Sequence, residues 1–394
     1  MIRNIIHSIA ICLAVFALPF MVACSSQEES LLEDTSEATL YLNIELIEQT
    51  RMGATMLPDN EKMKSVRVIV LHADGTVEHN RQFSLEGSQV QKYILLKVTP
   101  NEKKKIFLFA NEESVSNVEG VSMADGNKTL TAFFNSYTEG MSGFEEAVNN
   151  LYFAPDYTGG KSIPMSSMYE IDFPEKGNFD GTFYVVRVAT KFTVNFKNWR
   201  GEEIIVKNFT IERHADKNFL MAHVKDSEQN RQLFNGKTWI NWLRNVSDAS
   251  SENDDYTTTE AAGWLKDYEL PAQANKGITY THGAVTVGKP IVDIDFPDNS
   301  KPGIAKDVPV FYLPESMNIK AGATDGEQEY AMTISIDGRT EPFVCKLPNL
   351  KALFRNTHVV VNITVYQDLE ITADVIPYSK VTLDPTFGVD VKEQ

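Results

Sequence analysis

The chain has 394 residues, 42% of them hydrophobic, and its 54 acidic and 37 basic side chains give a formal net charge of −17. An acidic excess of this size argues against nucleic acid and anionic lipid surfaces as partners. The length is sufficient for two domains with substantial cores. Only three cysteines are present, and Cys345 stands apart from the two near the start, Cys12 and Cys24, so we expect no internal disulfide in the mature chain.

The first 24 residues have the pattern of a secretion signal. Arg3 precedes an apolar run from Ile9 to Ala23, and polar, acidic residues follow this run instead of a basic stop-transfer flank. The run is shorter than the roughly 20 residues of a membrane-spanning helix. It ends in Met-Val-Ala-Cys24, which resembles the bacterial lipobox, whose cysteine is acylated and becomes the new N-terminus.

We therefore predict that residues 1–23 are a lipoprotein signal peptide and that Cys24 carries the lipid, which would place the precursor on the outer membrane. The following SSQEES resembles the acidic export tag of surface lipoproteins in Bacteroidetes. The alternative is an ordinary cleavage site that happens to precede a cysteine.

Strand patterns dominate the first half of the chain. In residues 38–48, apolar side chains alternate with polar ones, which predicts a half-buried strand. The apolar face consists of Leu40, Leu42, Ile44 and Leu46. Residues 65–72 lead into Asp74-Gly75, a hairpin signal, and further strands are expected at 92–98 and 105–111.

The middle and the second half continue this pattern. Residues 111–150 read as short helices and loops, and residues 183–196 read as one long strand that opens a second β domain, with a boundary near residue 182. Two short helical patterns, at 239–243 and 260–270, fall in what we take to be an insertion. The spacing of strands and turns favours antiparallel sandwiches over βαβ units, so the predicted class is mainly β, with two antiparallel β-sandwich domains and short helical insertions.

Motifs of catalysis are absent from the sequence. It contains no Gly-rich phosphate loop, no G-x-S-x-G, no H-E-x-x-H and no C-x-x-C, so we expect no enzyme activity and no cofactor. A third alternative is a hydrolase whose paired carboxylates are brought together only by folding and so leave no motif. Asp293, Asp295 and Asp298 could together bind calcium, but an edge-strand charge pair explains them more simply, and no metal is expected.

Three tryptophans, Trp239, Trp242 and Trp264, lie within one 26-residue window. Their aromatic faces could form a ligand surface that stacks on sugars or on a partner protein. The alternative is a small satellite core over one sandwich, because helical spacing usually marks a buried stripe.

The C-terminal residues 374–394 have the pattern of a strand, although chain ends usually fray. Tyr378, Val381 and Leu383 are strand formers, and Val381 and Leu383 share one face. An apolar strand face requires a cover, which is either this molecule or another one.

Several segments together resemble the fimbrillins of Bacteroidales, the type V pilus subunits that include the FimA-like and Mfa-like proteins. Besides the lipobox, the following segments occur in the order of the family: EKMKSVRVIVLHADGTV, KKIFLFANEES, LYFAPDYTGGKSIPMSS, VVRVATKFTVNF, LFRNTHVVVNITVY and VIPYSKVTLDPTFG. The resemblance is spread over nearly the whole chain and rests on the series, since no single segment is diagnostic.

This resemblance implies two transthyretin-like sandwich domains, at 52–182 and 183–394, behind a propeptide at 24–51. It also implies that an arginine-specific protease removes the first strand, here by a cut between Arg51 and Met52. The opened groove then accepts the C-terminal strand of another subunit, here Tyr378 to Asp390, with Tyr378, Val381, Leu383 and Phe387 as its contact residues. Arg67 and Arg81 also follow the first strand, but Arg67 lies inside a strand pattern.

The predicted function is thus a structural subunit of a surface adhesion fimbrium, in a shaft or adaptor position, whose partners are copies of itself or paralogues. Its precursor would be anchored in the outer membrane by lipid, and the processed form would be part of the extracellular fimbrium. The alternative is a surface lipoprotein that does not polymerise and binds a glycan or host ligand.

Overall fold

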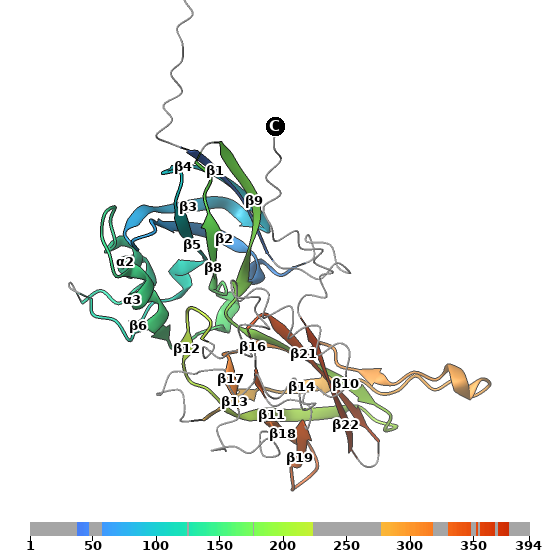
Figure 1. Ribbon diagram of the computed structural model, residues 1–394. Coiled ribbons are helices and arrows are strands. Elements are labelled where there is room, and N and C mark those ends of the chain that lie inside the picture. Colours follow the sequence, from blue (N-terminus) through green and yellow to red (C-terminus); the bar gives the residue numbers. More distant parts are fainter. Residues whose placement is uncertain are drawn as a thin grey trace, which may run out of the picture.

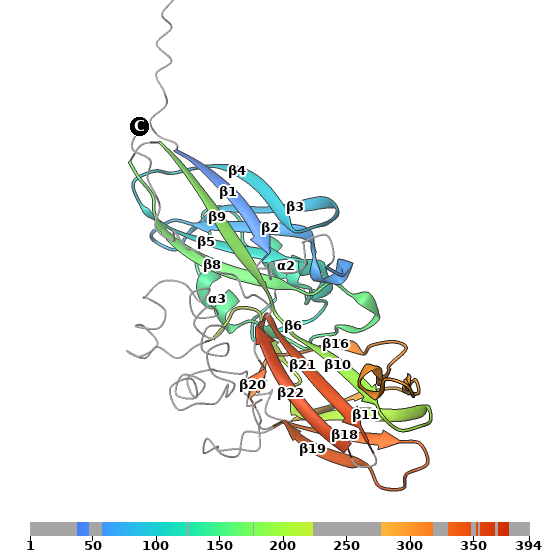
Figure 2. The same cartoon turned by 90° about the vertical axis from the view of Figure 1, so that its right-hand side faces the viewer.

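The computed structural model describes residues 38–46, 57–123, 126–175, 177–223, 277–317, 330–347, 352–353, 355–366 and 369–377. Strands make up most of these ranges and form two β-sandwich units, the first from the blue to green half of the chain and the second from the yellow to red half (Figures 1 and 2). The predicted class, mainly β with short helices, is confirmed.

The first unit is built on a seven-stranded sheet in the order β3-β2-β5-β8-β9-β1-β4. Its strands are β1 (Ala38–Leu46), β2 (Met63–Leu71), β3 (Val77–Gln89), β4 (Gln91–Val98), β5 (Lys103–Ala110), β8 (Met165–Asp172) and β9 (Asn178–Arg187). Side chains of β2, near one end of this sheet, and of β4, at the other end, belong to one core cluster. The sheet therefore curls over its own apolar face to form the sandwich.

The opposite face of β2 and β5 is covered by α2 (Leu130–Asn135) and α3 (Phe144–Asn150). Phe109 of β5 packs on Phe134 of α2, with ring centroids 4.4 Å apart, and Phe107 meets Phe144 of α3 edge to face at 5.2 Å. Because these parts of β2 and β5 are buried on both faces, residues 68–71 and 106–110 are continuously apolar instead of alternating.

The second unit packs two sheets against each other. One contains β10 (Thr190–Asn198), β15 (Gly303–Ile304), β16 (Val310–Leu313), β21 (Thr357–Val365) and β22 (Leu369–Pro377), and the other contains β11 (Ile204–His214), β13 (Ile278–His282), β14 (Val285–Val287), β18 (Tyr330–Ile336) and β19 (Phe343–Leu347). Apolar side chains from β10 and β21 meet those from β11 and β18 in a single core cluster.

Small elements complete the described structure. They are the short strands β6 (Val118–Glu119), β7 (Tyr152–Phe153), β12 (Asn218–Phe219), β17 (Ser316–Met317) and β20 (Ala352–Leu353), and the 3-10 turns η2 (Asp59–Glu61), η3 (Glu112–Ser114), η4 (Thr158–Gly160) and η6 (Pro297–Asn299). Strand β12 pairs with β7 and so links the two units.

Two strand pairings among the described strands are parallel, whereas the sequence had suggested antiparallel sheets throughout. They are β1 with β9 and β10 with β21. The partners are separated by more than 130 residues in the chain, so no local turn determines their relative direction.

The expectation of a single long strand over residues 183–196 was wrong. The chain leaves the first sheet after Arg187 and enters the second at Thr190, so the segment belongs to two strands, β9 and β10. Residue 182 lies inside β9, where Thr182 pairs with Asn43 of β1. The domain limits at 182 and 183 themselves stay a prediction.

Candidate functional site

The first strand, β1, occupies a slot between two other strands of the curled sheet (Figure 2). It pairs antiparallel with β4 from Ala38 to Glu45 and parallel with β9 from Thr39 to Leu46, which makes eight register pairs on each side. Alternation of apolar and polar residues predicted a strand at 38–48, and the structure has it at Ala38–Leu46.

The inner face of β1 lies in the core of the first sandwich. Its five alternate side chains are at most 4% exposed: Ala38, Leu40, Leu42, Ile44 and Leu46. They belong to the same cluster as side chains from β2, β4, β5, β8 and β9. The predicted apolar face of the first strand is therefore a central part of this core.

The outer face of β1 is held by polar contacts. Gln91 of β4 donates from Nε2 to Asn43 Oδ1 and to Glu45 Oε1, each at 2.8 Å. Lys97 Nζ, also on β4, donates to Thr39 Oγ1 at 2.9 Å. These contacts span neighbouring strands at the surface, where water competes for the same groups, so the inner face provides most of the stabilisation.

Both neighbours of β1 depend on it for their own pairing. Among the described strands, β4 pairs with β1 and with no other. Strand β9 pairs with β8 only at Val186 and Arg187, so its residues 178–185 have β1 as their described strand partner. Removal of β1 would thus expose an apolar trough whose two walls both carry unpaired backbone N–H and C=O groups.

Other predicted site residues lie outside the described residues. These are the lipidation residue Cys24, the processing residues Arg51 and Met52, the tail residues Tyr378, Val381, Leu383 and Phe387, and the tryptophans Trp239, Trp242 and Trp264.

The two arginines weighed against Arg51 are described, however. Arg67 is 3% exposed in β2 and pairs with Glu112 at 2.6 Å, so it is sequestered from a protease, whereas Arg81 is exposed on β3.

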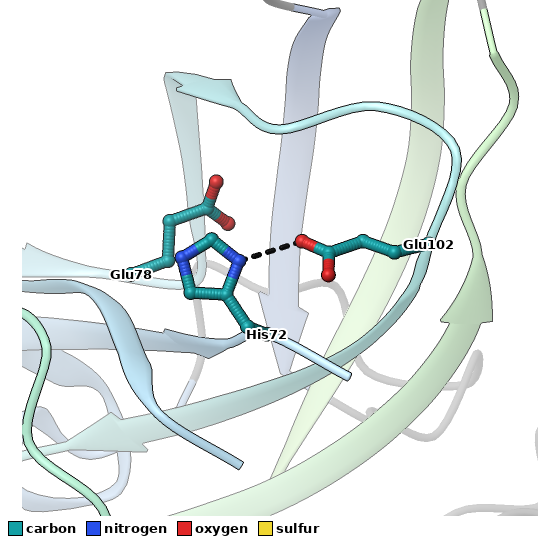
Figure 3. A group of neighbouring side chains, drawn as sticks. All are labelled: His72, Glu78 and Glu102. Carbon is teal, nitrogen blue, oxygen red and sulfur yellow. Dashed lines mark hydrogen bonds and ion pairs between the residues drawn. The ribbon is translucent and has the colours of Figure 1, made fainter. Parts of the chain in front are cut away.

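One group of three metal-ligating side chains lies close together in the described part of the chain: His72, Glu78 and Glu102 (Figure 3). His72 Nδ1 lies 2.6 Å from Glu102 Oε1. The fully buried Lys104 places its ammonium against both carboxylates, at 2.6 Å from Glu78 Oε2 and in contact with Glu102. Burial raises the pKa of Glu102, but the hydrogen bonds from Lys104 and His72 outweigh this and hold the pKa below its usual value. Lys104 therefore supplies the positive charge that a metal ion would otherwise bring.

The aspartates considered for calcium have a different role. The Asp293 carboxylate accepts hydrogen bonds from the backbone N–H groups of Asp295 at 3.1 Å and Phe296 at 2.9 Å. Asp293 thus closes a local turn. Asp295 and Asp298 do not join it in a three-ligand group among the described residues.

Buried charges join the two sandwich units, and the sequence analysis missed them. Glu61 in η2 is fully buried and pairs with Lys191 of β10 at 2.6 Å, while the Tyr312 hydroxyl of β16 donates to the same carboxylate. Burial raises the pKa of Glu61, but Lys191 and then Arg187 outweigh it, so the pKa lies below its ordinary value. Arg187 Nε also donates to the Glu61 carbonyl oxygen at 3.0 Å.

A second buried ion pair lies at the same junction. Arg355 is fully buried and contacts the Glu315 carboxylate, which is itself 1% exposed. The Arg355 guanidinium also donates to the carbonyl oxygens of Leu220 at 2.9 Å and Phe219 at 3.0 Å. A lone charged residue inside an apolar stretch, such as Arg187 in YVVRVAT, was the one sequence signal that could have indicated such a junction.

No helix among the described residues is long and apolar enough to cross a membrane.

No family model and no curated protein matches the chain. Comparison with solved structures did find matches. The C-terminally truncated tip fimbrial protein Mfa3 from Porphyromonas gingivalis is similar at 12% identity with a TM-score of 0.47, covering 86% of this chain and 99% of that one. The fimbrilin FimA from the same organism is similar at 12% identity and a TM-score of 0.43, with coverages of 86% and 97%. A fimbrial assembly protein from Parabacteroides distasonis is similar at 10% identity and a TM-score of 0.42, with coverages of 86% and 98%.

The chain is similar in fold to these fimbrial proteins. At these identities the likeness concerns the fold alone.

Proposed function

We propose that this protein is a structural fimbrial subunit that polymerises by strand exchange and has no catalytic role. Cleavage after Arg51 releases β1, and the C-terminal segment Tyr378 to Asp390 of another subunit takes its place. The observation that carries the proposal is the position of β1, which is the described strand partner of all of β4 and of residues 178–185 of β9.

The energetics favour replacement over an empty slot. Complete burial of a Leu or Ile side chain contributes roughly 1.5 to 3 kcal/mol, so Leu40, Leu42, Ile44 and Leu46 together contribute about 6 to 12 kcal/mol. This sum is comparable to the whole free energy of unfolding of a typical domain, about 5 to 15 kcal/mol. A subunit that has lost β1 therefore gains strongly from any strand that restores the burial and the backbone pairing.

The C-terminal sequence has the period that the slot requires. Every second residue from 381 to 389 is apolar: Val381, Leu383, Pro385, Phe387 and Val389. This gives five alternate positions, the same number as the buried face of β1. Pro385 has no N–H, so one backbone hydrogen bond to the slot is lost. Burial of the large apolar side chain of Phe387 helps to offset this loss.

Processing at Arg51 would also detach the subunit from its membrane. Cys24 precedes Arg51, so the lipid leaves with the propeptide. The removed segment carries seven acidic residues and one basic residue, which changes the net charge from −18 without the signal peptide to −12. The lipid anchor thus holds the precursor at the outer membrane, and cleavage releases it into the extracellular fimbrium.

The test uses the chain from Ser25 onward, which lacks the lipid but keeps every described residue, with a limiting amount of arginine-specific protease. We expect a new N-terminus at Met52. Light scattering should show growth into oligomers that resist denaturant. Arg51→Ala should remain monomeric, and Arg81→Ala, which removes an arginine that is exposed on β3, should polymerise normally.

Two substitutions in the tail separate cleavage from exchange. Leu383→Asp should be cut at Arg51 and yet fail to polymerise, whereas Thr382→Asp, on the opposite face of the tail, should reduce polymerisation much less. A wild-type chain that is cut at Arg51 and stays monomeric would refute strand exchange and favour a surface lipoprotein that binds a ligand without polymerising.

A further inference from the structure

The cluster of His72, Glu78 and Glu102 in Figure 3 also contacts the end of β4. Glu78 Oε1 accepts a hydrogen bond at 2.5 Å from the backbone N–H of Thr99, the residue that follows β4. Glu78 belongs to β3, which is not a strand partner of β4, since these two strands are the opposite ends of the seven-stranded sheet. The contact is therefore a side-chain link across the open side of the curled sheet.

Glu78 lies in a bulge of β3. In the pairing of β2 with β3, consecutive residues of β2 face Val77 and His79, so Glu78 is an extra residue without a register partner. A bulge of this kind changes the direction in which a side chain points. Val77 and Glu78 are both buried although they are neighbours in a strand. The bulge thus accounts for a buried carboxylate next to the end of β4.

Lys104 of β5 holds this carboxylate in position. Lys104 is fully buried, and its Nζ lies 2.6 Å from Glu78 Oε2, the oxygen that does not bind Thr99. Lys104 also contacts Glu102, whose carboxylate lies 2.6 Å from His72 Nδ1. Opposite charges compensate one another within this group, so one oxygen of Glu78 is fixed and the other can accept from β4.

The next residue of β3 makes a second contact with β4. His79 Nε2 donates to the carbonyl oxygen of Lys97. Glu78 and His79 therefore hold one backbone N–H and one backbone C=O at the C-terminal end of β4. We refer to Glu78, His79 and Lys104 as the clasp. None of these residues belongs to β1, so a cut that releases β1 leaves the clasp intact.

The other end of β4 is held by the chain itself, because Val90 alone separates β3 from β4. The Val90 carbonyl oxygen accepts from the Leu46 N–H of β1 at 3.0 Å, and this bond is lost together with β1. The inner side chains of β4 pack in a core cluster of which β1 is itself a part. When β1 leaves, β4 thus loses its described strand partner and part of its packing, while the clasp still binds its far end.

We propose that Glu78, fixed by Lys104, is a positioning residue that keeps β4 in place while the slot is empty. This proposal rests on the strand exchange described above. An incoming strand then meets a wall that is already ordered. A loose β4 would have to be ordered at each binding event, at a cost in conformational entropy for every residue of the strand, and association would be slower.

The experiment uses the chain from Ser25 onward with Leu383→Asp, which should be cut at Arg51 and stay monomeric. Gel filtration in low urea removes the released peptide 25–51, and a labelled synthetic peptide of residues 378–390 serves as the incoming strand. Hydrogen exchange of the Thr99 amide reports whether the end of β4 is held. Stopped-flow fluorescence gives the association rate of the peptide.

We expect the Thr99 amide to stay protected in the cleaved parent and to lose its protection in Glu78→Ala. Glu78→Ala should also bind the peptide about tenfold more slowly, because β4 must first be ordered. His79→Ala removes only the contact to Lys97 and should slow association by a smaller factor. It keeps the proposal testable if Glu78→Ala does not fold.

Two control variants separate positioning from general stability. Glu86→Ala removes an exposed carboxylate from the same strand and should behave as the parent. Leu130→Ala removes a buried side chain of α2, whose core cluster contains no residue of β4. It should destabilise the same unit, yet leave the protection of Thr99 and the association rate unchanged.

Three results would overturn the proposal: free exchange of the Thr99 amide in the cleaved parent, association of Glu78→Ala as fast as that of the parent, or equal slowing in Leu130→Ala. Failure of strand exchange gives a different result. A cleaved parent that keeps Thr99 protected and binds no peptide would refute strand exchange, while its hydrogen exchange would still confirm that the clasp holds β4.

Discussion

The Arg355 and Glu315 pair is buried between the two sandwich units, where an unpaired charge is costly. Glu315→Ala should therefore lower the free energy of unfolding by about 3 to 5 kcal/mol, because it leaves the guanidinium buried without its carboxylate. The matched control is Glu202→Ala, whose carboxylate is 72% exposed and lies 3.3 Å from Arg200. That change should cost less than about 1 kcal/mol in urea unfolding. Equal effects of the two substitutions would contradict a structural role for the buried pair.

His358 gives the junction a pH dependence. Burial, and then the neighbouring positive charge of Lys191, lower the pKa of His358 to about 4 from the ordinary histidine value of 6.5, although Glu61 acts in the opposite direction. Between these two values the unfolded chain binds a proton that the folded chain does not, so stability falls as the pH falls from about 6.5 toward 4. The loss amounts to at most about 3 kcal/mol.

This dependence can be measured by comparing unfolding at pH 7.5 and pH 5 in the wild type and in a His358 variant, because the carboxylates and other histidines that titrate in this range contribute equally to both proteins. His358→Gln retains a polar partner for Thr193, whose Oγ1 lies 2.8 Å from His358 Nε2, and should reduce the difference between the two pH values. The ring titration of His358, followed by NMR, should have its midpoint near pH 4. A midpoint near 6.5, or an unchanged difference in the variant, would show that this residue does not set the dependence.

At the scale of elements, β1 has two faces with separate consequences. Leu42→Ala, on the buried face, should destabilise the uncut protein by about 2 to 5 kcal/mol and should speed polymerisation after cleavage, since β1 leaves the slot more readily. Tyr41→Ala, on the 39% exposed outer face, is the matched control and should change both quantities much less. Chemical denaturation measures the stability of the uncut protein, and light scattering after protease addition measures the rate of polymerisation. Slower polymerisation in Leu42→Ala would argue that departure of β1 is not part of assembly.

The local elements could be predicted because their cause is local. Alternation of apolar residues indicated β1, and a near-continuous apolar run with Asp74-Gly75 after it indicated β2 and its return strand β3. The slot itself could not be predicted from pattern, because it arises from pairings between β1 and strands that follow much later in the chain. The break between β9 and β10 was missed for a similar reason: Val188 and Ala189 are apolar and buried like their neighbours, so nothing in the sequence marks the change of sheet.

The polar junction was invisible to sequence reasoning. Glu61 lies in a 3-10 turn of three residues, and its partner Lys191 is 130 residues away. Such a pair leaves no periodicity or motif, and each residue alone is indistinguishable from a solvated charge. The predictions for the lipid site, the cleavage site and the tail stay predictions, because those residues lie outside the described ranges.

At the scale of the whole molecule, the buried charges couple the two sandwich units. Lys191, Arg187 and Tyr312 all converge on Glu61. We therefore expect one cooperative transition in calorimetry of the wild type. Glu61→Ala should lower the transition temperature and separate it into two steps, because it removes the buried carboxylate on which Lys191 of the second unit converges. Asp59→Ala, which removes a 77% exposed carboxylate from the same turn, should leave a single transition near the original temperature. A single unshifted transition in Glu61→Ala would show that the units are coupled by other contacts.

The slot between β4 and β9 has a mechanical consequence. A strand that lies there has eight register pairs along each of its two edges. Tension along the strand axis loads both ladders in shear, so their hydrogen bonds must break together, whereas a transverse force opens them one pair at a time. A filament joined by such strands in line with its length would bear strong traction while attached to a surface, and would come apart only where a strand is peeled from its end.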